Sequence, residues 1–207
     1  MEVSKIIKDA RNLFLITVVA GLLLGVVYEV TKAPRAKQEQ LKIEQAYQKV
    51  FSDADAFEDV KMDEKKAASY IAEKGITESQ AVVNDVVLAK AGGEDAGYIV
   101  TVTDKEGYGG DIKFTVGIQL DGTVTGVSIL SIGETAGLGM KANEPAFLDQ
   151  FAGKKVDAFA YTKTGKSKDN EIDAISGATI TTKAMTNGTN AGIVYYKSLV
   201  EGGVISE

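Results

Sequence analysis

The first pattern along the chain is an uninterrupted apolar run near the N-terminus. From Leu13 to Tyr28 the sequence LFLITVVAGLLLGVVY contains no charged residue, and about 18–20 apolar residues are enough for a helix to cross a bilayer core. The run has no polar face, which disfavours a buried core helix. No small-residue cleavage signature follows it, which disfavours a removed signal peptide. We therefore expect one retained membrane anchor within residues 1–33, closed by Pro34.

Basic residues flank both ends of this run, so the charge pattern alone leaves its orientation open. Three of them lie within residues 5–11 and three within residues 32–37, whereas an excess on one side would mark the cytoplasmic end. A short N-terminal tail before a larger domain is typical of a signal anchor. We therefore expect a single-pass protein of the cell membrane, anchored in lipid, with its domain on the extracytoplasmic side.

After the anchor, the hydrophobic residues are first spaced as in helices and then as in strands. Apolar residues recur at helical spacing between Leu41 and Phe51, and Glu64–Gly75 indicates a second short helix that ends at its glycine. From Ala81 onward, β-branched segments alternate with Gly- and Asp-containing turns, which predicts a meander of antiparallel strands. The four predicted strands are AVVNDVVLAKA (81–91), GYIVTVTDK (97–105), IKFTVGIQL (112–120) and VTGVSILSI (124–132).

The C-terminal part predicts two further helices. One spans Pro145–Gly153, with proline at its start and glycine at its end. A polar stretch, TKTGKSKDN (162–170), follows as a solvated loop. Beyond Thr182, small residues recur at helical spacing and form a stripe that can pack closely on a sheet. This stripe consists of Ala184, Gly188, Ala191, Tyr195 and Leu199.

These patterns place the chain in the α+β class, with an antiparallel sheet and flanking helices behind one transmembrane helix. We divide it into a tail and anchor (1–33), a helical linker with the start of the soluble domain (34–80), and an α+β domain (81–207). The 207 residues are enough for one medium-sized domain with such an appendage.

The composition limits the possible chemistry of the protein more than it limits its fold. The chain contains no Cys and no His, which excludes Cys/His zinc sites, Cys-ligated iron–sulfur clusters, His-ligated haem and His-dependent nucleophilic machinery. We expect no metal centre and no stand-alone catalytic site. The net charge is −6, with basic residues concentrated near the anchor, so the domain would repel phosphate backbones and we expect no nucleic-acid partner. Any redox chemistry would need an organic cofactor.

Two glycine-rich segments are candidate sites with ordinary alternatives. In YGGDIKFTVGI (108–118), Gly109 and Gly110 would most often make a turn, but they also permit close approach of a flat ligand. SIGETAGLGMK (131–141) directly follows a predicted strand and could form a concavity of backbone N–H groups. It lacks the spacing and the βαβ context of a dinucleotide fingerprint.

The third segment is DAISGATITT (173–182), which indicates a helix N-terminus with a Ser or Thr cap. Such an end presents free N–H groups and the positive end of the helix dipole, so it favours phosphate. The residues alone therefore permit a bound phosphate there, and they do not establish a covalent bond.

Together the three segments resemble the FMN-binding domain family, whose members carry flavin covalently. The family motif is an acidic residue, two further residues and then Ser/Thr-Gly-Ala-Thr, matched here by Asp173 and by residues 176–179. The resemblance implies FMN joined through a phosphodiester to Thr179 by a flavin transferase that recognises Asp173. Residues 134–139 match the family's Glu-Thr-Pro-Gly-Leu-Gly loop near the flavin, with Ala136 in place of proline. The residues so assigned to FMN are Thr179, Ser176, Gly177, Ala178, Glu134, Thr135, Gly137, Leu138 and Gly139.

The layout further resembles the G subunits of Rnf complexes, membrane electron-transfer complexes that link ferredoxin and NAD to ion pumping. The shared features are the single N-terminal span, the chain length and TKAPRAKQ (31–38) behind the anchor. This implies an electron-relaying flavoprotein subunit whose partners are the other membrane subunits. Two alternatives remain open: the C subunit of the sodium-translocating NADH:quinone reductase, and an anchored extracytoplasmic ligand-binding or sensing module.

Overall fold

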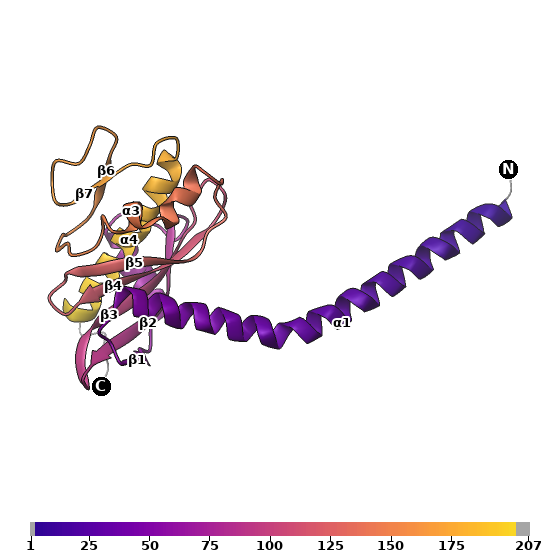
Figure 1. Cartoon of the computed structure of the whole chain (residues 1–207), viewed down its shortest axis with the longest axis horizontal. Helices are drawn as coiled ribbons and strands as arrows, with labels where there is room; N and C mark the ends of the chain where they lie inside the picture. The colour runs from indigo at the N-terminus through magenta and orange to yellow at the C-terminus, as the bar shows by residue number, and fades with distance from the viewer. Residues whose placement is uncertain (1–2, 202–207) are drawn as a thin grey trace. The chain divides into compact units, whose positions relative to one another are not determined.

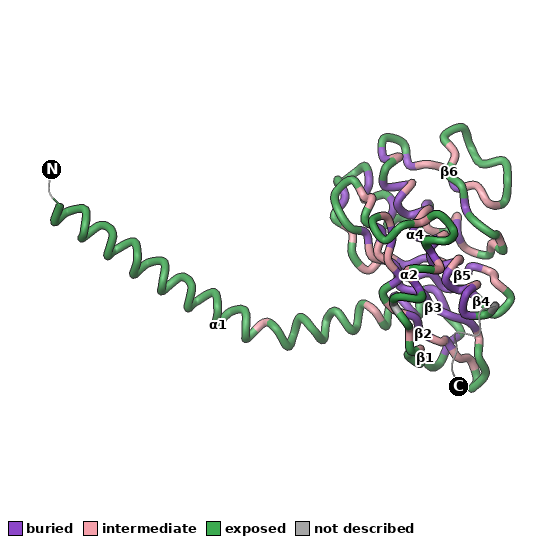
Figure 2. Tube along the Cα trace, turned by 180° about the vertical axis from the view of Figure 1, so that it is seen from behind, coloured by how far each residue is buried: buried purple, intermediate pink, exposed green. Residues whose placement is uncertain are grey.

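The N-terminal apolar run lies in one long helix, α1 (Val3–Val50), in the computed structural model, which describes residues 3–201. Every residue from Val3 to Val30 is exposed (Figure 2). Within the described residues, this is the one helix long and apolar enough to cross a membrane. A single N-terminal apolar helix with no covered face fits a membrane anchor. The chain divides into two compact units between Ile43 and Glu44.

The prediction that Pro34 closes the anchor is wrong, because Pro34 lies inside α1. Proline removes one backbone donor and strains the preceding turn. Here it is followed by a run of strong helix formers, residues 35–50, that continues the helix. The division of the chain at residues 33 and 80 stays a prediction. Residues 1–2 and 202–207, at the ends of the predicted segments, lie outside the described residues.

A five-stranded antiparallel sheet forms the centre of the domain (Figure 1). The predicted meander and the α+β class are confirmed. Consecutive strands are neighbours in the order β1-β2-β3-β4-β5, and Gly92 and Gly93, both with positive φ, make the tight turn between β2 and β3. The edge strand β1 was not predicted. The strands are β1 (Ala56–Asp59), β2 (Ala81–Ala91), β3 (Glu94–Asp104), β4 (Ile112–Gln119) and β5 (Val124–Ser131).

One face of the sheet is covered by α4 (Thr179–Glu201), with α2 (Glu64–Glu73) beside it. The predicted small-residue stripe of α4 is buried, as expected. Gly188 shows why the stripe is small, since a Cβ there would lie 2.6 Å from Cζ of Phe114 on β4. The helix therefore packs directly on the strand.

The opposite face of the sheet receives the last turn of α1. Val50 and Phe51 are buried against glycines of the central strands. A Cβ at Gly117 would lie 2.9 Å from Cβ of Val50, and one at Gly97 would lie 2.7 Å from Cζ of Phe51. The end of α1 is thus part of the core of the domain, as the helical period of its sequence suggests.

The segment between β5 and α4 carries small elements that support the C-terminal motif. They comprise a 3-10 helix η1 (Gly139–Asn143), a short helix α3 (Pro145–Leu148) and the strands β6 (Ala160–Thr162) and β7 (Glu171–Asp173). The two strands pair in parallel and were not predicted. Phe151 packs edge-on against Phe147 and Phe159, with ring centroids 5.6 and 5.1 Å apart. These contacts fill the space under the segment.

We expect Asn190→Ala to destabilise the domain by about 1–3 kcal/mol, because the substitution leaves buried backbone groups unpaired. Asn190 on α4 binds the backbone of Phe159 twice, accepting from its N–H at 2.7 Å and donating to its carbonyl at 2.9 Å. Urea unfolding monitored by circular dichroism measures the change. Asn170→Ala is the control, since that side chain makes a single, solvent-exposed hydrogen bond, to the carbonyl of Ala158. Equal losses in both variants would contradict the prediction.

Candidate functional site

The three candidate segments, far apart in the sequence, converge on one cavity of about 550 Å³. The first runs from the loop after β3 into β4, the second from the end of β5 into η1, and the third leads into α4. The volume is in the range of small-molecule and cofactor sites, roughly 300–1,000 Å³. The lining residues are Tyr108, Glu134, Thr135, Leu138, Gly139, Gly177, Ala178, Thr179, Ile180 and Thr181.

The segment between β3 and β4 contributes one wall. Tyr108 lies at the mouth with 71% of its surface exposed. The predicted glycines, Gly109 and Gly110, do not line the cavity. Gly109 instead packs on the second segment, where a Cβ would lie 2.2 Å from the carbonyl oxygen of Gly133. The close approach that this glycine permits is therefore to protein backbone.

Glu134 forms the inner part of the cavity. It is 7% exposed, and within residues 3–201 its Oε1 has no hydrogen-bond partner. Two glycines make room for the side chain: a Cβ at Gly139 would lie 2.5 Å from Oε2, and one at Gly107 would lie 3.0 Å from Oε1. A buried acceptor without a donor is costly, so this site suits a ligand that brings an N–H or O–H group.

The helix α4 begins at Thr179, which is half-buried and lines the cavity. The expected Ser or Thr cap is wrong, because Ala178 precedes the helix. The hydroxyl of Thr182 instead joins the helix to the turn before it: it accepts from the N–H of Ile175 and donates to the carbonyl of Ala178, both at 3.0 Å. This leaves the N–H groups of residues 179–181 without an acceptor inside the described residues.

The predicted residues Ser176, Gly137 and Asp173 do not line the cavity. Ser176 and Gly137 are exposed in the adjoining turns. Asp173 ends β7, where its Oδ1 accepts from the N–H of Lys166 at 2.6 Å and its own N–H donates to Gln150. It orders the loop behind the motif. The other predicted residues, namely Gly177, Ala178, Thr179, Glu134, Thr135, Leu138 and Gly139, all line the cavity.

Three lining residues were not predicted: Tyr108, Ile180 and Thr181. Tyr108 lies in the glycine-rich segment already singled out, so its position beside Gly109 was the available signal. Ile180 and Thr181 follow the motif directly. The side chain of Thr181 lies near Glu134, since its Oγ1 is 2.7 Å from the position of a Cβ on Gly139. Which residues of a first helical turn face a cavity depends on the packing angle of the helix.

An ion pair joins the cavity's wall to α4. Glu106 accepts from Nζ of Lys183 and from Nδ2 of Asn187, each at 3.0 Å. The hydrogen bond from Lys183 is the main reason that the pKa of Glu106 lies below its usual range, and the same bond raises the pKa of Lys183. We name the Glu106–Lys183–Asn187 group the clamp. It ties the segment carrying Tyr108 to the helix carrying Thr179.

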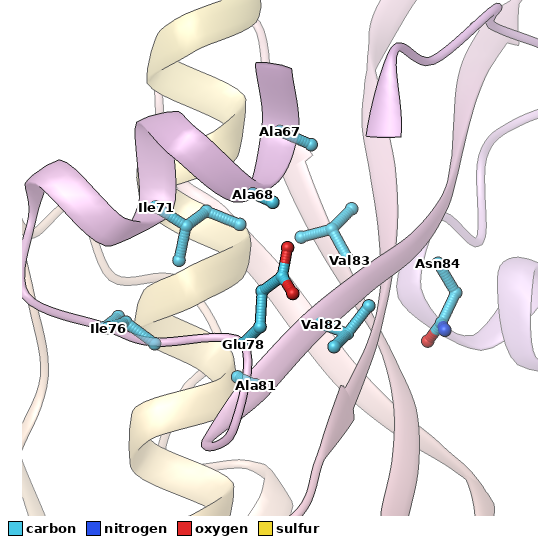
Figure 3. Close-up of a pocket in the computed structure, with 9 residues that line it drawn as sticks. All are labelled: Ala67, Ala68, Ile71, Ile76, Glu78, Ala81, Val82, Val83 and Asn84. Carbon is cyan, nitrogen blue, oxygen red and sulfur yellow. The ribbon is translucent and has the colours of Figure 1, made fainter. Parts of the chain in front are cut away.

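A second hollow, of about 350 Å³, lies between α2 and β2 (Figure 3). Its lining includes Ala67, Ile71 and Val83, with the carboxyl group of Glu78 reaching over it. None of the three motif segments contributes to it. The cavity at the start of α4 is therefore the candidate functional site.

Comparison with known proteins defines the class of this fold and site. The model of the FMN-binding domain family matches residues 107–194, which include all three segments of the cavity. The crystal structure of NqrC from Shewanella oneidensis shares the fold, with a TM-score of 0.52, 18% sequence identity and coverage of 76% of this chain and 87% of that one. The chain therefore contains an FMN-binding domain with an NqrC-like fold.

Two curated relatives specify the family further. The G subunit of the Na(+)-translocating ferredoxin:NAD(+) oxidoreductase complex of Acetobacterium woodii is 37% identical over 190 residues, covering 90% of this chain and 89% of the relative. The G subunit of the proton-translocating complex of Clostridium ljungdahlii is 34% identical over 191 residues, covering 92% and 91%. The chain belongs to the family of G subunits of ion-translocating ferredoxin:NAD(+) oxidoreductase complexes.

The residues of the cavity fit FMN on three structural observations. The N–H groups at the start of α4, which have no acceptor in the described part of the chain, suit a phosphate. Oε1 of Glu134 has no donor among residues 3–201, and a ribityl hydroxyl or the ring N–H can supply one. Gly139 lets the Glu134 carboxyl group lie in the cavity, since a Cβ at that position would be 2.5 Å from Oε2. The apolar side chains of Leu138 and Ile180 add surface for the flat ring.

Proposed function

We propose that this chain is the membrane-anchored flavoprotein subunit of an Rnf-type complex, in which it relays electrons between other subunits. The named functions of the two curated relatives support the proposal, as does the apolar helix α1. Its partners are the other membrane subunits of that complex, and α1 contacts lipid. The coupling ion differs between the two relatives, so it is not assigned to this chain.

The observation that carries the proposal is the position of Thr179, which begins α4 and lines the cavity. We propose that FMN is attached there. An Oγ–P bond to Thr179 forms, a P–O bond of a flavin-containing phosphoanhydride breaks, and the hydroxyl proton leaves with the displaced phosphate. A flavin transferase catalyses this step, and Asp173 takes part in its recognition by ordering the segment before the motif.

The side chains around Thr179 then bind and orient the cofactor. The N–H groups of residues 179–181 stabilise the phosphodiester charge through hydrogen bonds and the helix dipole. Glu134 would accept from a donor on the flavin, while Leu138 and Tyr108 would shield the ring from water. Once bound, FMN supplies one- or two-electron transfer, chemistry that no side chain of this chain provides.

We place the domain on the extracytoplasmic side of the membrane. A covalent tether suits this location, because a cofactor lost outside the cell could not be recovered. Cysteine introduced at Ser167, in the exposed β6–β7 loop, should react with a membrane-impermeant maleimide in intact cells. Reaction only after lysis would place the domain inside.

The cofactor proposal is tested by a denaturing gel viewed under ultraviolet light. The full chain is expressed with and without a flavin transferase. We expect flavin fluorescence at the position of the polypeptide in the first case and none in the second. Mass spectrometry should show the added mass on the peptide containing Thr179. A dark band in the presence of the transferase would overturn covalent attachment and favour a noncovalent ligand-binding module.

A further inference from the structure

Asp104, at the end of β3, is a buried carboxyl group outside the cavity. Its side chain is 0% exposed, and within residues 3–201 its Oδ2 has no hydrogen-bond partner. Its Oδ1 accepts from the N–H of Glu106 at 2.8 Å. Gly188 of α4 lies directly against it, since a Cβ there would be 3.3 Å from Cβ of Asp104. The group is thus enclosed between the sheet and the helix.

Three charged groups face Asp104 from the elements around it. Glu106 belongs to the same segment, Asp111 precedes β4, and Lys183 projects from α4. Burial is the main cause that raises the pKa of Asp104 to about 7, and the two carboxylates add to it. The Glu106 N–H bond and Lys183 oppose the shift without cancelling it. Because the folded pKa exceeds the ordinary value of 3.8, folding favours the protonated form.

Ionisation of Asp104 acts directly on the clamp. A new negative charge would lie beside Glu106, to whose backbone Asp104 is already bonded. It would repel the Glu106 side chain and compete with it for Lys183, whose positive charge also acts on Asp104. In the neutral form, the clamp keeps both of its hydrogen bonds without this competition.

The clamp in turn holds the wall of the cavity. Glu106 is followed by Gly107, which lies against Glu134. Next come Tyr108, which lines the cavity, and Gly109, which packs against Gly133. Lys183 lies one turn beyond Thr179 on α4. A change at Glu106 therefore reaches the cavity through adjacent residues on both sides.

We propose that Asp104 is a positioning residue whose protonation state controls how firmly residues 106–110 are held against α4. When Asp104 is neutral, the hydrogen bonds of the clamp are intact and the wall formed by residues 106–110 is ordered. When Asp104 is ionised, both the clamp and the wall are weakened. The proposal rests on the proposed function only in naming FMN as the occupant of the cavity. It makes the flavin environment pH-dependent through a group that does not touch the flavin.

The sign of the pH dependence follows from the raised pKa. Stabilisation of the closed wall by the neutral carboxyl is fully present below the ordinary pKa of aspartate. It is lost as the pH rises through about 7. Between about pH 6 and about pH 8, the ionised fraction rises from roughly one tenth to roughly nine tenths. The wall is therefore closed at mildly acidic pH and loosened at mildly alkaline pH.

Amide hydrogen exchange of the full chain in detergent tests the proposal without flavin. After correction for the intrinsic rate, exchange in residues 106–110 is expected to rise about tenfold between about pH 6 and about pH 8. Asp104→Asn, which cannot ionise, should keep the slow exchange at both values. Asp111→Asn is the matched control, because it removes an exposed carboxylate next to the same segment and should keep the transition.

Three outcomes would overturn the proposal. They are exchange without pH dependence in the wild-type chain, the same dependence in Asp104→Asn, and loss of the dependence in Asp111→Asn. In the flavin-bearing chain, visible circular dichroism of the flavin should change over the same pH range and become flat in Asp104→Asn. A flat signal in the wild type, together with a pH-dependent wall, would overturn the link to the cofactor. Failure of flavin attachment leaves the exchange measurement intact.

Discussion

Thr179→Ala should abolish covalent flavin in the full chain, while the domain remains folded. Thr179 is half-buried, lines the cavity and makes no side-chain hydrogen bond within residues 3–201, so its hydroxyl is not needed for structure. Removing it eliminates the nucleophile that the proposed phosphodiester requires. In-gel fluorescence per mole of polypeptide measures the loss, and circular dichroism checks the fold.

Two further hydroxyl variants make this result specific. Thr179→Ser keeps the attacking oxygen and should retain flavin. Thr182→Val removes a hydroxyl three residues away that is fully buried and makes two hydrogen bonds. It should retain flavin on every molecule that folds, although its unfolding free energy falls by about 1–3 kcal/mol. Fluorescence that survives in Thr179→Ala and disappears in Thr182→Val would show that the flavin is attached to Thr182 and not to Thr179.

Gly139→Val should lose most of the flavin by displacing the Glu134 side chain within the cavity. A Cβ at this position would lie 2.5 Å from Oε2 of Glu134 and 2.7 Å from Oγ1 of Thr181, closer than real contacts allow. The two branches of valine would enlarge the conflict and displace Glu134 into the space that the ligand needs. We expect flavin incorporation to fall at least about tenfold.

The matched control for this variant is Gly192→Ala on the buried face of α4. There a Cβ meets side-chain atoms of Val116 and Val102 at 3.4–3.7 Å, which is ordinary contact. This variant should incorporate flavin as the wild type does. The ratio of flavin to protein absorbance in both purified chains measures the effect. Normal flavin content in Gly139→Val would show that the space beside Glu134 is not used by the ligand.

The local sequence pattern predicted the strands and helices whose buried faces consist of regularly spaced residues of their own. The β-branched period from Ala81 onward predicted four strands, and β2 has the predicted bounds. The stripe that includes Gly188 predicted the buried face of α4. In each case the residues of the buried face recur at the spacing typical of a strand or a helix. A few neighbouring residues are therefore enough to predict the element.

Elements that depend on partners elsewhere were missed. β1 is four residues long and pairs only with β2, while β6 and β7 have three residues each. Such short segments contain too few positions for a period to be visible. The loop between β6 and β7 is closed by Glu171, which accepts from the N–H groups of Ser167 and Lys168. Its polar sequence predicted only a solvated loop.

For the candidate site, too, the sequence predicted the local features and missed those that depend on distant contacts. The sequence pattern was enough to predict an apolar anchor, an antiparallel sheet, and a helix beginning at a motif suited to phosphate. It could not predict that three segments share one cavity, that Glu134 is buried there with no donor to Oε1 among residues 3–201, or that Asp104 lies next to the clamp. Burial and convergence depend on contacts between residues distant along the chain, and no local period encodes them.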